Sequence, residues 1–191
     1  MKFQAVPLAG AYVVVLEPFQ DHRGMFVRTF CMEVLKQIGH NKPIAQANHS
    51  MTRQEGAVRG MHYQLPPKAE IKLVRCMRGS VYDAIIDLRA GSPTFLQWYG
   101  VELSADNMRM MYVPEGCAHG FQVLQAESEL LYFHTAEYSP AHEQAVRYDD
   151  PVVGIKWPLP VADVSDRDRS HPLLTKDFAG IVLSPGPGGC P

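Results

Sequence analysis

Short stretches rich in β-branched and aromatic residues recur along most of this chain, and turn-forming residues separate them. Glycine, proline or aspartate lies close to the ends of these stretches. Closely spaced short strands with such turn signals are typical of β-sandwiches and β-barrels. The stretches that predict strands are residues 11–18, 71–77, 81–89, 95–103, 109–114, 119–125 and 129–138. We therefore expect an all-β fold.

One short helix is predicted near the N-terminal end. The apolar residues Phe30, Val34, Leu35 and Ile38 recur at helical spacing. Gly39 follows them, and glycine is a common C-terminal stop for a helix. Just before this segment, residues 19–30 contain a turn signal at positions 21–24.

A β-hairpin is predicted around residues 79 and 80. Residues 71–77 alternate in polarity, with Lys72, Val74 and Cys76 on one side of the predicted strand. The pair Gly79-Ser80 is suited to a tight turn, and residues 81–89 would form the returning strand.

Length and composition predict one folded domain and exclude some partners. The chain has 191 residues, 46% of them apolar, which is enough for one sizeable core. Its net charge of −2 includes no basic surplus that would favour nucleic acid or an anionic membrane. The apolar stretch at the N-terminal end is interrupted by Pro7, Gly10 and Tyr12, so it is not expected to be a signal peptide. No apolar run approaches the length of a membrane span.

The cysteines and the C-terminal region carry weaker signals. The four cysteines, Cys31, Cys76, Cys117 and Cys190, are scattered and form no C-x-x-C pair, which favours a reducing, cytoplasmic compartment. After residue 151 prolines become frequent, and we expect a segment that wraps around the domain with a little helix. Residues 175–191 end in "SPGPGGCP", and we expect a mobile tail there.

Two histidines in predicted strands could bind a metal, fill a core or transfer a proton. His62 lacks a second histidine two residues on, and Lys72 nearby in the sequence would repel a cation. A metal centre is therefore not expected. For His119 alone, an ordinary structural role is favoured. His62 lies between Arg59 and Lys72 in the sequence, and that charge pattern suits an anionic ligand or a developing oxyanion.

Six segments in order give the chain a clear resemblance to a known family. They are "FQDHRGMFVRTF", "QANHSMTRQEGAVRGMHYQ", "KLVRCMRGSVYDAIIDLR", "VPEGCAHGF", "LLYFHTAEYSPAHEQAVRYDDPVVGIKWP" and "SDRDRSHPLL". Over residues 3–174 the sequence resembles the dTDP-4-dehydrorhamnose 3,5-epimerases. The resemblance implies one cupin-type domain over residues 1–174, a double-stranded β-helix (jelly roll) with a few short helices. It also implies a homodimer whose N-terminal strands cross between subunits, and no metal or cofactor.

The same resemblance implies a reaction and its catalytic residues. The family inverts carbons 3 and 5 of a dTDP-linked 4-keto-6-deoxyhexose in rhamnose-type deoxysugar biosynthesis. By position, His62 matches the family's base, Asp168 its carboxylate partner, Tyr132 the acid, and Lys72 the lysine beside the sugar carbonyl. A hydrogen next to a ketone is weakly acidic because its loss gives an enolate, so a base, an opposed acid and a cation are sufficient.

The family match also suggests a set of substrate-binding residues. Arginine forks suit the diphosphate, and aromatic rings suit stacking on the base or the sugar. The residues carried over are Arg23, Gln46, Asn48, Arg59, His119, Glu143 and Arg167, with Phe26 and Tyr138 as candidates for stacking.

Two departures and three alternatives accompany this interpretation. Arg28 stands where the family usually has glutamate, and Glu137 replaces one of two neighbouring aromatic residues. The reversed charge at Arg28 leaves the nucleotide base open. An epimerase acting at one carbon, a metal-dependent cupin dioxygenase or isomerase, and a non-catalytic sugar-binding cupin are the alternatives. Inversion at one carbon and inversion at two carbons need the same base and acid, so the sequence does not distinguish them.

Overall fold

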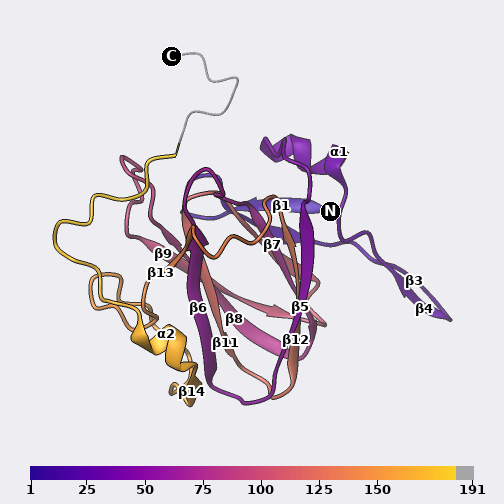
Figure 1. The fold of residues 1–191 in the computed structure, drawn as a ribbon. Helices are drawn as coiled ribbons and strands as arrows, with labels where there is room; N and C mark the ends of the chain where they lie inside the picture. Colours follow the sequence, from indigo (N-terminus) through magenta and orange to yellow (C-terminus); the bar gives the residue numbers. More distant parts are fainter. Residues whose placement is uncertain (184–191) are drawn as a thin grey trace.

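A computed structural model of the chain describes residues 1–183, and these form two facing antiparallel sheets (Figure 1). The first sheet has the order β1 (Lys2–Ala5), β2 (Tyr12–Val15), β10 (Arg109–Val113), β7 (Lys72–Arg78), β12 (Ser128–His134) and β5 (Gln46–Thr52). The second has the order β13 (Glu143–Ala145), β6 (Ala57–Gln64), β11 (Cys117–Val123), β8 (Ser80–Asp87) and β9 (Trp98–Ser104). The expected all-β jelly roll is confirmed.

The remaining elements are short. Strand β14 (Asp163–Val164) pairs with β6 in the parallel direction, and β3 (Phe19–Asp21) and β4 (Gly24–Phe26) form a separate hairpin. Helix α1 (Met32–Leu35) continues into the 3₁₀ turn η1 (Lys36–Ile38), which ends at Gly39 in the left-handed conformation, as the sequence predicts. Helix α2 (Asp166–Ser170) begins after Ser165, whose side chain accepts a hydrogen bond from the Asp168 N–H. No helix within residues 1–183 combines the length and apolar character needed to cross a bilayer.

Apolar side chains form three layers around the two sheets. The layer between the sheets includes Val74 and Met111 from the first sheet and Ile85 and Phe121 from the second. A second cluster lies on the outer face of the first sheet, where Leu35 of α1 packs. A third lies on the outer face of the second sheet, under the C-terminal region. Because the second sheet is covered on both faces at its centre, β8 and β11 are buried over almost their whole length.

The predicted hairpin at residues 79 and 80 is wrong. Strand β7 pairs with β10 and β12, whereas β8 pairs with β11 and β9 in the other sheet. Gly79 has a φ of 75° and carries the chain from one sheet to the other. A side chain there would meet the backbone of Ser128 at 3.1 Å, so the crossing requires glycine for its space as well as its backbone. The alternation of β7 itself is as predicted, because Lys72, Val74 and Cys76 point between the sheets and Leu73 points outward.

Strands β6 and β11 approach closely where two glycines face each other. A Cβ on Gly120 would lie 2.6 Å from the Arg59 carbonyl oxygen and 3.0 Å from the Gly60 Cα. The pairing of the two strands is irregular here, with His119 opposite His62 but Phe121 opposite Arg59. A register shift of this kind changes which side chains share a face. Arg59 and His62 therefore line the same cavity, although regular alternation would separate them.

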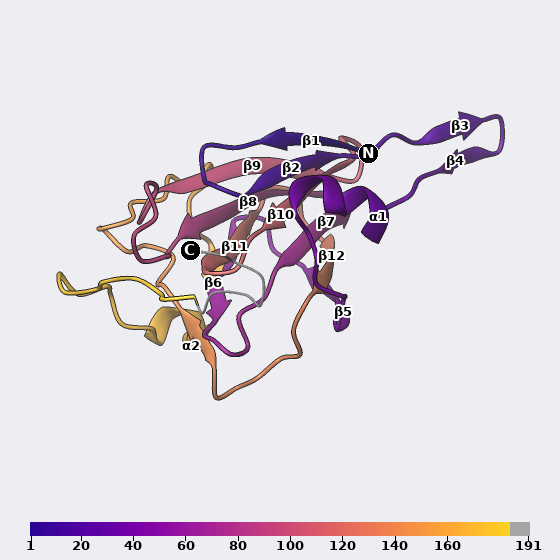
Figure 2. The same ribbon diagram turned by 90° about the horizontal axis from the view of Figure 1, so that it is seen from above.

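The C-terminal region covers the second sheet (Figure 2). Val153 is buried there, and the Trp157 indole donates to the Tyr148 carbonyl at 3.0 Å. The first part of the expected tail, residues 175–183, is attached to the domain. Ile181 exchanges backbone hydrogen bonds with Leu88 and Ala90, and the Phe178 ring stacks on Phe95. The rest of that expected tail, residues 184–191 with Cys190, lies outside the described residues.

The β3–β4 hairpin projects from the barrel and packs on no part of it (Figures 1 and 2). Phe19 and Phe26 retain 79% and 72% of their accessible surface, and Met25 is also exposed. A two-stranded hairpin is only marginally stable by itself, and neighbouring exposed aromatic rings usually mark a contact surface.

The close approach of β6 and β11 can be tested by adding one methyl group. We expect Gly120→Ala to lower the free energy of unfolding by about 1–3 kcal/mol, because a Cβ there collides with the β6 backbone. Gly91→Ala is the control, since its Cβ meets nothing within 4 Å and only its φ of 74° is unfavourable. That control should lose about 1–2 kcal/mol. Urea unfolding gives both values, and an unchanged stability for Gly120→Ala would contradict the steric argument.

Candidate active site

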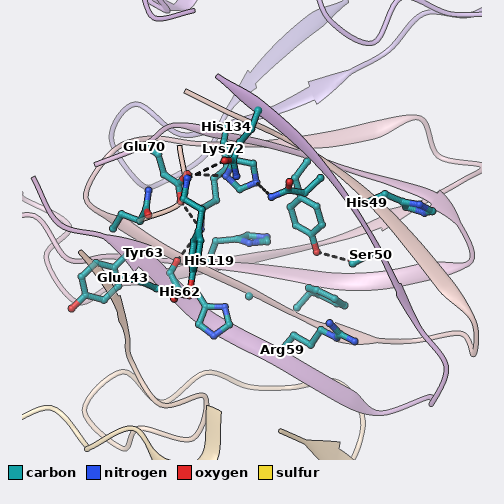
Figure 3. A pocket seen from close by; sticks show the side chains of 17 residues that line it. His49, Ser50, Arg59, His62, Tyr63, Glu70, Lys72, His119, His134 and Glu143 are labelled. Carbon is teal, nitrogen blue, oxygen red and sulfur yellow. Dashed lines mark hydrogen bonds and ion pairs between the residues drawn. The ribbon is translucent and has the colours of Figure 1, made fainter. Parts of the chain in front are cut away.

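A cavity of about 280 Å³ opens between the two sheets at one end of the barrel (Figure 3). Strands β5, β7 and β12 supply one wall, and β6 and β11 supply the other. Nine of the residues singled out from the sequence line this cavity. They are Gln46, Asn48, Arg59, His62, Lys72, His119, Tyr132, Tyr138 and Glu143.

His62 and Asp168 form a hydrogen-bonded pair in the second-sheet wall. The His62 Nε2 lies 2.7 Å from the Asp168 Oδ1, and the Gly60 N–H donates to the other carboxylate oxygen at 3.2 Å. Burial works against the charge on Asp168, but the His62 hydrogen bond and charge, with the Gly60 N–H, outweigh it and lower the pKa of Asp168. An ionised Asp168 holds the proton of His62 on Nε2. The Nδ1 atom is then the nitrogen that can accept a proton.

Tyr132 belongs to the opposite wall. It lies on β12 of the first sheet, and its hydroxyl is 3.2 Å from the Ser50 Oγ (Figure 3). Burial raises the pKa of Tyr132 well above its ordinary value. The phenol therefore keeps its proton at neutral pH and can act as a proton donor.

Lys72 is a buried cation in the same wall as Tyr132. Its ammonium donates to the His62 carbonyl oxygen at 3.1 Å and lies 3.4 Å from the Glu70 Oε1. The second oxygen of Glu70 is 2.8 Å from the Nδ1 of His134. Burial raises the pKa of Glu70, but His134 and Lys72 outweigh that effect, so the net shift is downward. A fixed positive charge of this kind can stabilise a developing oxyanion.

His119 also has a carboxylate partner, but a deeper one. Its Nε2 lies 2.7 Å from the Oδ2 of Asp83, which is completely buried. Burial raises the pKa of Asp83, and the attraction of His119 opposes that shift only in part. The His119 ring meets the Tyr132 ring edge to face, with centroids 6.1 Å apart. The His119 ring is therefore held between the Asp83 carboxylate and the Tyr132 ring.

Polar side chains surround the mouth of the cavity. Glu143 accepts a hydrogen bond from the Tyr138 hydroxyl at 2.6 Å and also pairs with Arg167. Gln46 accepts from the Tyr138 N–H at 2.9 Å, which ties β5 to this loop. Arg59 is exposed and forms no ion pair with any residue from 1 to 183. Its guanidinium is thus available to an anion at the mouth.

Arg23 and Phe26 do not reach the cavity of their own chain. Both lie on the projecting β3–β4 hairpin, where Arg23 pairs with Asp21 at 2.6 Å. Of the other sequence-derived residues, Asp168 lies behind His62 and Arg167 lies beside Glu143.

One group of side chains within residues 1–183 has the composition of a metal site. His62, Asp168 and His171 each offer a ligand atom, and these atoms lie within 4.8 Å of one another. Two ligands of a tetrahedral zinc ion stand roughly 3.3 Å apart. The 2.7 Å separation of His62 and Asp168 is instead the length of a strong hydrogen bond. As arranged, the pair fits proton transfer better than metal coordination.

Sequence reasoning missed several residues of the cavity lining, among them three whose side chains contact predicted site residues. Glu70, His134 and Ser50 are all part of its lining. Strand alternation could have found all three. Glu70 lies two residues before Lys72, His134 two residues after Tyr132, and Ser50 two residues after Asn48.

A jelly roll with a histidine–carboxylate pair on one wall and a buried tyrosine and lysine on the other defines a cupin-type enzyme equipped for proton transfer. The family model described as dTDP-4-dehydrorhamnose 3,5-epimerase matches residues 5–176. The chain belongs to this family of isomerases.

Individual relatives agree with the family match. A dTDP-4-dehydrorhamnose 3,5-epimerase of Sinorhizobium fredii is 40% identical over 175 residues, covering 91% of this chain and 90% of the relative. The crystal structure of an epimerase from Legionella pneumophila, solved with dTDP-4-keto-L-rhamnose, is 32% identical with a TM-score of 0.88, covering 96% and 99% of the two chains. A 3'-monoepimerase from Streptomyces bikiniensis, solved with dTDP-quinovose, is 35% identical with a TM-score of 0.81, covering 88% and 85%.

The ionic partnership of Asp168 should appear in the pH dependence of stability. Since its pKa is lowered in the folded state, Asp168 stabilises the protein at pH values above the unfolded pKa of about 3.9, and this contribution is lost as the pH falls through the lower, folded pKa. We expect Asp168→Asn to cost about 1–2 kcal/mol at pH 7 and progressively less below pH ~4. Urea unfolding at several pH values measures this difference.

Asp166→Asn is the matched control. Asp166 is exposed in the same helix, so its replacement should change stability by less than about 0.5 kcal/mol at any pH. A cost for Asp168→Asn that stayed constant down to pH 3 would contradict the linkage.

Proposed function

We propose that the protein inverts carbons 3 and 5 of a dTDP-linked 4-keto-6-deoxyhexose, in the formation of a rhamnose-type deoxysugar. The observation that supports this most directly is the placement of His62 and Tyr132 on opposite sheets, with the cavity between them. Inversion of a carbon requires that its proton leave from one face and that a new one arrive from the other.

The proposed reaction needs a base, a cation and an acid, and His62, Lys72 and Tyr132 would supply them. Nδ1 of His62 removes the proton next to the ketone, and Asp168 stabilises the imidazolium that results. Electrons from the broken C–H bond move to the carbonyl oxygen, and Lys72 stabilises the enolate. Such a preorganised donor contributes roughly 3 kcal/mol to the transition state. Tyr132 then gives its proton to the opposite face of the carbon.

The substrate class is supported by the relatives and by the cavity mouth. The Legionella relative was solved with a dTDP-linked 4-keto sugar. Here Arg59, at the mouth, would bind the diphosphate, with Gln46, Asn48, His119, Tyr138, Glu143 and Arg167 as the remaining contacts of this chain.

A second candidate is inversion at a single carbon. The similarity to the 3'-monoepimerase of Streptomyces bikiniensis favours it, because that chain shares the fold at comparable identity. The same base and acid serve both outcomes, and the difference lies in whether the sugar can turn within the cavity after the first inversion.

We further propose a homodimer in the cytoplasm, with the N-terminal strands exchanged between subunits. The exposed Phe19 and Phe26 support a contact of the β3–β4 hairpin with a second chain. Arg23 and Phe26 would then serve the neighbouring chain's cavity, which explains why they are remote from their own. Among the described residues, Cys31, Cys76 and Cys117 are free thiols, in keeping with a reducing compartment.

The double inversion can be tested by isotope exchange. When dTDP-4-keto-6-deoxyglucose is incubated with the protein in deuterated water, we expect deuterium to be incorporated at carbons 3 and 5. NMR measures the incorporation at each carbon. His62→Ala should lower both exchange rates by about a thousandfold while dTDP still binds, because the proposed base is removed. Exchange at one carbon alone would establish the single-carbon alternative.

Tyr132→Phe and a chelator complete this test. Tyr132→Phe should impair inversion more than proton removal, since it leaves the base in place. Treatment with EDTA should leave exchange unchanged, whereas a metal-dependent cupin would lose activity and contain metal in stoichiometric amount. A protein that binds dTDP-sugar but exchanges no proton would be a binding module.

The exchanged hairpin can be tested by mixing two inactive variants. Arg23→Ala damages the hairpin, and His62→Ala damages the cavity. If the hairpin acts on the neighbouring chain, a mixed dimer contains one intact site, so refolding the two variants together should restore roughly a quarter of wild-type activity. If Arg23 acts in its own chain, the mixture will show no more activity than the two variants measured separately.

A further inference from the structure

A continuous polar chain runs along the first-sheet wall of the cavity (Figure 3). It begins at Lys72, passes through Glu70 and His134, and ends at Asn48, whose Nδ2 lies 3.3 Å from the His134 Nε2. Glu70 and His134 are both buried, with 9% and 8% of their surface accessible. Both line the cavity, and neither has a part in the proposed proton transfers. Each contacts a residue with a proposed role in binding or catalysis: Glu70 contacts Lys72, and His134 contacts Asn48.

The geometry around Lys72 leaves one of its three N–H groups for a ligand. One N–H donates to the His62 carbonyl at 3.1 Å, and a second faces Glu70 at 3.4 Å. A buried ammonium is costly without a counter-charge, and Glu70 supplies it. The carboxylate therefore both favours the charged amine and fixes the direction of the remaining N–H.

His134 has a defined orientation for the same reason. Its Nδ1 donates to Glu70 at 2.8 Å, which directs Nε2 toward the Asn48 amide. Asn48 donates one amide N–H to that atom, which leaves its carbonyl oxygen and second N–H for the cavity. The ring also stacks on Tyr132, with centroids 6.0 Å apart and an angle of 26° between planes.

We propose that Glu70 and His134 are positioning residues of this site. Glu70 holds the Lys72 ammonium charged and directed at the substrate's carbonyl oxygen, and His134 holds the Asn48 amide and the Tyr132 ring in their binding orientation. This inference rests on the proposed function and assigns separate effects to the two residues. Glu70 acts mainly on kcat, because the charge on the carbonyl oxygen develops only in the transition state. His134 acts mainly on KM, through Asn48.

Other ionisable groups also face Lys72. His62 lies on β6, Asp83 on β8, His119 on β11 and Tyr132 on β12. Asp83 is hydrogen-bonded to His119, and Asp168 is hydrogen-bonded to His62. Within residues 1–183, Glu70 is the carboxylate that contacts Lys72 directly. Its removal should therefore affect the charge of Lys72 more than any change at these neighbours.

Glu70→Gln tests the first half of the proposal, because glutamine keeps the size of the side chain but loses the charge. We expect kcat to fall about tenfold or more, KM to change less than about threefold, and the alkaline limb of the kcat–pH profile to move about one unit toward lower pH. Glu127→Gln is the control. It breaks an exposed ion pair with Arg78, far from the cavity lining, and should leave all three quantities unchanged.

A Glu70→Gln variant with wild-type kcat and an unshifted pH profile would overturn the role of Glu70. A merely structural contribution would lower stability without moving the pH profile. If this variant does not fold, Glu70→Asp keeps the charge, and it should retain the wild-type alkaline limb even where kcat falls. An alkaline limb displaced in Glu70→Asp as well would overturn the role.

His134→Phe tests the second half, because phenylalanine preserves the stack on Tyr132 and removes both ring nitrogens. We expect KM to rise about tenfold with kcat within about threefold of wild type. Adding Asn48→Ala to His134→Phe should raise KM no further than Asn48→Ala does alone, since the two side chains act in series. Additive effects, or an unchanged KM in His134→Phe, would overturn the role of His134.

The wild-type protein separates these outcomes from a failure of the proposed function. If the wild type exchanges no proton in the dTDP-4-keto sugar, the proposed function itself is wrong. If it does exchange protons and the Glu70 and His134 variants behave as wild type, only the positioning roles are wrong.

Discussion

Charged side chains inside a closed barrel each need a partner within hydrogen-bonding distance, and this requirement organises the whole site. Three carboxylates meet it by pairing with histidines: Asp168 with His62, Asp83 with His119, and Glu70 with His134. Lys72 shares the last of these. Because removing a partner would leave a buried charge uncompensated, the pairs hold one another in place. The cavity therefore has its polar groups in fixed directions before any ligand enters.

The two sheets divide the chemistry between them. The first sheet holds Tyr132 and Lys72, and the second holds His62 with Asp168 behind it. Facing sheets pack about 10 Å apart, which leaves room for one sugar ring where large core side chains are absent. The crossing at Gly79 contributes to this division, since it sends β7 and β8 to different sheets. A β7–β8 hairpin would have placed their polar residues on the same wall.

Strand periodicity predicted the inward direction of Lys72, Val74 and Cys76, because local alternation depends only on the pleat. It could not predict which strands pair. A glycine at position 79 suits a tight hairpin turn and a crossing between sheets equally well. Contacts between residues distant in sequence decide which of the two forms.

The site itself was predictable to the extent that a family match could be carried over residue by residue. Regular alternation would have separated Arg59 from His62, but both line the cavity in a stretch where the pairing with β11 is irregular. Alternation places Glu70 and His134 on the same side as Lys72 and Tyr132, but neither belongs to a motif, and only the folded structure shows that they pair with each other. For Arg23 the family match predicted a ligand contact, but Arg23 does not reach the cavity of its own chain.

The projecting hairpin also has a consequence for how variation in this protein would be inherited. Arg28, which departs from the family pattern, follows β4 at the base of the hairpin and is exposed. In an exchanged dimer, any preference that this arginine imposes on the nucleotide base would be expressed in the neighbour's cavity. A cell that carried two alleles would then form hybrid molecules in which each pocket selects its ligand with an arm encoded by the other gene copy.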